Sequence, residues 1–142
     1  MKRLYGVAVY ELENTIEVIR FRSDSELYDF NISQGVQLEE MGYNLAQLII
    51  TTDKIIYLKT LLKARLKALV ALLHYHSDLH FKAHLGHYSD EVYENMNKCM
   101  EANEESLMFS IGCVVSRLLR AGVDVDDELA LQCYEYRESA RV

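Results

Sequence analysis

Residues 53–87 carry the pattern that most restricts what this chain can fold into. Five leucines recur there at the three- and four-residue spacing that places side chains on one face of an α-helix: Leu58, Leu62, Leu66, Leu69 and Leu73. Four of the five histidines continue the same stripe: His76, His80, His84 and His87. The chain contains no proline, so nothing forces a kink or a stop. We therefore predict one long helix, from about Asp53 to Leu85. Its apolar face consists of leucines at first and of titratable histidines toward its end.

Two β-rich runs precede this helix. Residues 4–12 and 15–22 are rich in Val, Ile, Tyr and Phe, and two polar residues separate them. We expect an antiparallel hairpin in which Val9 faces Val18. Both faces of this hairpin carry apolar side chains, and an isolated two-stranded hairpin is marginally stable in water. We therefore expect it to pack on helices of its own chain, with a dimeric sheet as the alternative.

Helical periodicity dominates the rest of the chain. Further helices are predicted over residues 23–30, 37–50, 90–121 and 124–139. The 142 residues are enough for one domain with a single core. The predicted fold is therefore mainly α (α+β), with an N-terminal β-hairpin at residues 1–22 packed on a four- to five-helix bundle at residues 23–142.

Charge is distributed unevenly in a chain whose formal net charge is -7. Residues 51–87 carry six Lys or Arg against two acids, whereas residues 88–142 carry five against twelve. We expect the basic helix to pair with acidic helices of the same fold, and a basic strip for an anionic partner is the alternative. The net charge argues against general nucleic-acid binding, because such binding needs positive surface.

The cysteines and the apolar segments point to a cytoplasmic protein. Three cysteines in no framework spacing suggest reduced thiols inside a cell. The N-terminus lacks the apolar core of a secretion signal. The most apolar region, around residues 61–73, is interrupted by Lys63, Arg65 and Lys67, so no membrane span is expected.

The histidine stripe is the one candidate site. Histidines four residues apart on a helix can share one metal ion, and zinc or another divalent transition metal is the candidate cofactor. His76 and His84 are about 12 Å apart along a helix axis, so one ion can take only a neighbouring pair. The remaining ligands would come from elsewhere. The carboxylates that follow on the next helix are candidates: Asp90, Glu91 and Glu94.

Other roles for the histidines compete with metal binding. Histidines near a helix C-terminus interact favourably with the helix dipole and its free carbonyls. Histidines on a packed face are often hydrogen-bonded core residues. A pH-sensitive interface is a further reading, and chance clustering is another.

No catalytic motif or catalytic residue is identified, so the sequence leans away from an enzyme. The favoured function is a small binding or regulatory protein that contacts an unidentified protein and forms a homodimer, because so long a helix needs cover. The alternative is a metal-dependent helical enzyme that uses His80 and His84. A third hypothesis is an acidic decoy for a nucleic-acid-binding partner, formed by residues 88–142.

Overall fold

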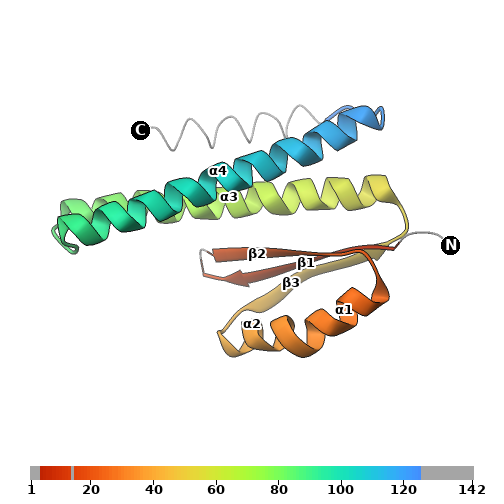
Figure 1. Cartoon of the computed structure of the whole chain (residues 1–142), viewed down its shortest axis with the longest axis horizontal. Coiled ribbons are helices and arrows are strands. Elements are labelled where there is room, and N and C mark those ends of the chain that lie inside the picture. Colours follow the sequence, from red (N-terminus) through yellow and green to blue (C-terminus); the bar gives the residue numbers. More distant parts are fainter. Residues whose placement is uncertain (1–3, 14, 126–142) are drawn as a thin grey trace.

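The computed structural model of the chain describes residues 4–13 and 15–125. These residues form three layers, with a sheet between a pair of long helices on one side and a short helical segment on the other (Figure 1). The elements, in order, are β1 (Tyr5–Leu12), β2 (Thr15–Phe21), α1 (Asp24–Phe30), η1 (Asn31–Gly35), α2 (Val36–Glu40), β3 (Asn44–Thr51), α3 (Lys54–His84) and α4 (Asp90–Arg120).

The sheet has three antiparallel strands in the order β2-β1-β3. The predicted hairpin is confirmed, and Val9 faces Val18 as expected. Its central strand, β1, is buried along Gly6–Tyr10 because helices cover both of its faces. The helices that pack on the hairpin therefore belong to the same chain, as predicted. A third strand, β3, pairs with the hairpin as well.

The predicted helix over residues 37–50 is wrong beyond its first turn. Helix α2 ends at Glu40, Gly42 turns the chain with a φ of 99°, and β3 begins at Asn44. The four- to five-helix bundle is wrong for the same reason. In the described ranges, the helical part consists of the α3–α4 pair and the short run α1–η1–α2. The helix predicted over residues 124–139 falls almost entirely outside the described residues.

The long helix is confirmed at both ends. The Asp53 carboxylate accepts hydrogen bonds from the amides of Ile55 and Ile56, so Asp53 is the N-cap of α3. Gly86 ends the helix with a φ of +80°, a conformation that glycine adopts without steric penalty. The 31 residues of α3 span about 46 Å, and the α3–α4 pair extends past one end of the sheet (Figure 1).

The leucine seam of α3 forms the main core. Leu58, Leu62, Leu66 and Leu69 are buried, together with Val7 and Val9 of β1 and apolar residues of α4. Helix α4, also 31 residues long, runs back along α3 and covers the part that lies beyond the sheet. The apolar face of α3 is thus packed against other elements of the same chain. No helix in the described part of the molecule is long and apolar enough to cross a membrane.

Candidate functional site

Two members of the histidine stripe, His76 and His80, contact α4, and His76 forms hydrogen bonds through both of its ring nitrogens. The His76 side chain is 13% exposed. Its Nδ1 lies 2.5 Å from Glu104 Oε1, and its Nε2 lies 2.6 Å from Asn97 Oδ1. The Asn97 side-chain amide donates to Glu101 at 3.2 Å, which directs the Asn97 oxygen toward His76. Both ring nitrogens of His76 are therefore hydrogen-bonded to side chains of α4.

His80 extends this cluster by one helical turn. Its ring stacks on that of His76, with centroids 4.6 Å apart, and its Nδ1 is hydrogen-bonded to the Tyr93 hydroxyl. His84 is the last residue of α3 and His87 lies in the turn that joins α3 to α4, and both are exposed. His76 is thus the half-buried member of the stripe, whereas His80, His84 and His87 are exposed. The contacts of His76 match the prediction of a hydrogen-bonded histidine on a helix interface.

The carboxylates suggested as metal ligands lie at the start of α4. Asp90 and Glu91 are in its first turn, and Glu94 pairs with Lys98 at 3.6 Å. Within residues 4–13 and 15–125, no group of three or more His, Cys, Asp or Glu side chains is arranged to hold a metal ion. The metal-binding set, with its zinc-like cofactor, stays a prediction.

The edge strand β3 is a surface that the sequence analysis did not anticipate. It carries no charged residue over its length, Asn44–Thr51. Leu45, Leu48 and Ile50 are each about half exposed. Their partners on β1 are Tyr10, Ala8 and Gly6, which alternate along that strand, so the three side chains share one face of the sheet.

A β-bulge makes this shared face possible. Leu45 and Leu48 are three residues apart, and a regular strand would point them to opposite faces. The pairing of β3 with β1 shifts register between Val9 and Tyr10, which adds one residue to β3 at that point. An apolar stripe therefore runs along the outer strand of the sheet.

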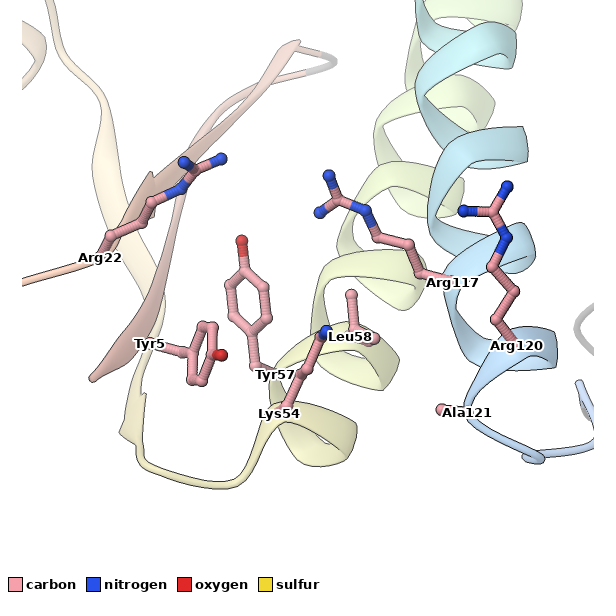
Figure 2. A pocket seen from close by; sticks show the side chains of 8 residues that line it. All are labelled: Tyr5, Arg22, Lys54, Tyr57, Leu58, Arg117, Arg120 and Ala121. Carbon is pink, nitrogen blue, oxygen red and sulfur yellow. The ribbon is translucent and has the colours of Figure 1, made fainter. Parts of the chain in front are cut away.

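A cavity of about 460 Å³ lies at the other end of the molecule from the histidines. Its charged lining residues are all basic: Arg22, Lys54, Arg117 and Arg120. Tyr5, Tyr57, Leu58 and Ala121 complete the lining, which contains no Asp or Glu among the described residues. Figure 2 shows the guanidinium groups of Arg22 and Arg117 pointing toward one another, with the Tyr57 hydroxyl directed between them.

The antiparallel layout of the fold gathers these side chains. Arg22 follows the last residue of β2, and Lys54 is the first residue of α3. Arg117 and Arg120 lie in the last turn of α4, which returns to the end where α3 begins. Sequence reasoning missed the site because its members are far apart in the chain. The one local signal was the three-residue spacing of Arg117 and Arg120, which places them near each other on a helix.

Arg65 of α3 does not line this cavity, but its pKa is influenced by one of the lining residues, Arg117. Burial, and then the nearby charge of Arg20, lower the pKa of the Arg65 guanidinium; Arg117 adds a smaller lowering that Tyr57 and Cys113 oppose. Arg65 also donates to the Ser110 carbonyl at 3.1 Å. Cationic side chains from β2, α3 and α4 thus influence one another at the sheet–helix boundary.

Comparison of this chain with protein-family models, with curated proteins and with solved structures finds no match.

Proposed function

We propose that this protein is a binding protein that works through protein–protein contact and pairs with a second copy of itself along β3. The observation that carries the proposal is the uncharged, apolar edge of the sheet. An edge strand presents unpaired backbone N–H and C=O groups to any strand that can reach it. The sequence suggested homodimerisation because the long helix needs a packing partner. In the structure α4 packs on that helix, so the proposal now depends on β3 instead.

The two edges of the sheet differ in protection. Soluble proteins usually guard edge strands with charged residues, prolines or bulges, because an open edge pairs with other chains. The outer strand β2 carries Glu17 and Arg20. The eight residues of β3 contain neither a charge nor a proline, and its bulge lies near one end. The contrast marks β3 as the edge that is open to pairing.

A second copy of the chain fits this edge in three respects. Two identical strands can pair antiparallel about a two-fold axis, so each favourable contact occurs twice. The absence of charge along β3 means that no like charges meet across the axis, although each molecule has a formal net charge of -7. The stripes of Leu45, Leu48 and Ile50 would adjoin on one face of a continuous six-stranded sheet.

Substitution of Leu48 tests the interface. We expect Leu48→Lys to weaken dimerisation by at least about tenfold, because two lysines would meet beside the axis in a partly apolar contact. Sedimentation velocity over a wide concentration range gives the dissociation constant. The matched control is Phe109→Lys on α4, which replaces a side chain that is 74% exposed and far from β3 in the chain.

Hydrogen exchange locates the contact. The outward amides of β3 should exchange slowly in the wild-type dimer and rapidly in Leu48→Lys, while the Phe109→Lys protein keeps the wild-type protection. A wild-type protein that stays monomeric at every concentration contradicts the proposal. Equal dissociation by both lysine variants would also contradict it, since that result would place the interface elsewhere.

A further inference from the structure

The cavity between the start of α3 and the end of α4 has the composition of an anion site. Four cationic side chains from three separate segments line it: Arg22, Lys54, Arg117 and Arg120. The structure describes eleven Lys and Arg residues in a chain of formal net charge -7. Gathering four of them around one cavity costs repulsion that an anion would remove.

Two acids near these cations in sequence are engaged in helix capping. The Asp53 carboxylate, beside Lys54, accepts from the amides of Ile55 and Ile56. Glu26 accepts from the Arg22 backbone amide at 2.7 Å, in a variant of the capping box at the start of α1. Among the described residues, none of the four cations of the cavity forms an ion pair. Their charge is left for a ligand.

We infer that this cavity binds the phosphate groups of a small ligand. Guanidinium groups bind phosphate oxygens through two parallel N–H donors, and a lysine ammonium supplies a compact charge beside them. The facing guanidinium groups of Arg22 and Arg117 can hold a phosphate from two sides, with the Tyr57 hydroxyl as a further donor (Figure 2). Tyr57 is held in place by stacking on Tyr5, with ring centroids 4.9 Å apart.

The size of the cavity favours a small molecule over an extended polymer. Its volume of about 460 Å³ falls in the range of small-molecule sites, roughly 300–1,000 Å³. A nucleic acid needs a continuous positive track, whereas this chain is acidic overall. Four cations in one cavity suit a compact group of high charge such as a diphosphate. The inference is independent of pairing along β3.

Inorganic pyrophosphate is the probe for this site, and calorimetric titration of the full chain is the measurement. We expect saturable binding at one site per chain, with affinity that falls as salt is raised. The double variant Arg22→Gln/Arg117→Gln should bind at least about a hundredfold more weakly, because it removes two charge-assisted contacts. Both side chains are exposed, so the fold should tolerate the change.

The matched control is Lys59→Gln/Lys63→Gln, which removes the same charge from exposed positions of α3 that do not line the cavity. It should bind pyrophosphate as the wild type does. Equal weakening in both double variants, or no saturable binding by the wild type, overturns the inference. Binding of a single-stranded oligonucleotide but not of pyrophosphate also overturns it. If the arginine double variant fails to fold, Arg120→Gln alone must still weaken binding about tenfold or more.

Discussion

At the scale of single residues, His76 shows how the environment separates side chains of the same type. It lies one helical turn from His80 and two from His84, yet it alone is held through both ring nitrogens, by Glu104 and Asn97. His84 is exposed at the last residue of α3. The leucine–histidine stripe predicted that these residues share a face. It could not predict their partners, because Asn97 and Glu104 come from a helix whose alignment with α3 depends on the whole fold.

Alanine at His76 and at His84 should therefore have different effects. We expect His76→Ala to lower the free energy of unfolding by about 1–3 kcal/mol, because it leaves two partly buried polar groups without their partner. His84→Ala should change it by less than about 0.5 kcal/mol, as is usual at exposed positions. Urea denaturation followed by circular dichroism measures both values. Equal effects would mean that the His76 contacts do not stabilise the helix pair.

At the scale of elements, the turn between α2 and β3 decides where helix gives way to strand. Gly42 adopts a φ of 99°, and a Cβ there would meet only a Leu12 methyl at 3.4 Å, an ordinary contact. The barrier to substitution is therefore the backbone conformation. Gly112 presents the opposite case, since it lies inside α4 with nothing within 4 Å of a Cβ.

Replacement by alanine should thus change the stability of the protein in opposite directions at these two glycines. We expect Gly42→Ala to destabilise the protein by about 1–2 kcal/mol through an unfavourable positive φ. Gly112→Ala should stabilise it by about 0.4–1 kcal/mol, because alanine reduces the freedom of the unfolded chain. Thermal unfolding of both variants gives the signs. A stabilising Gly42→Ala would show that the turn does not require its left-handed conformation.

The misassigned strand β3 shows why periodicity was misleading in this segment. Leu45 and Leu48 repeat at three residues, which on a helix indicates a shared face. The bulge opposite Val9 and Tyr10 produces the same result on a strand. The helix ends and the β1–β2 register were predictable because they depend on local caps and on one short turn. A bulge depends on the partner strand and leaves no mark in the sequence.

At the scale of the whole molecule, the acidic chain keeps a basic end and a histidine end about one helix length apart (Figure 1). The uneven charge suggested either internal pairing or an anionic partner. The structure shows limited pairing across elements among the described residues, such as Lys67 with Glu11 at 2.5 Å. The basic cavity could not be predicted, because Arg22, Lys54 and Arg117 meet only after the sheet and both long helices have docked.

Strand β1 has a consequence for how the molecule comes apart. Among the described elements, it alone contributes buried side chains to both apolar clusters, Val7 and Val9 on the side of α3 and Ala8 and Tyr10 on the side of α1. The α1–α2 layer can therefore open as a sub-global unit while the helix pair stays closed, but β1 is released only when both layers are lost.

Native-state hydrogen exchange in low denaturant should reveal two cooperative units. Amides of α1 and α2 should exchange by partial opening, with a smaller free energy than those of β1, which should exchange only through global unfolding. A single shared opening energy for all three elements would contradict this division. The central strand thus sets the number of steps in which the fold is lost.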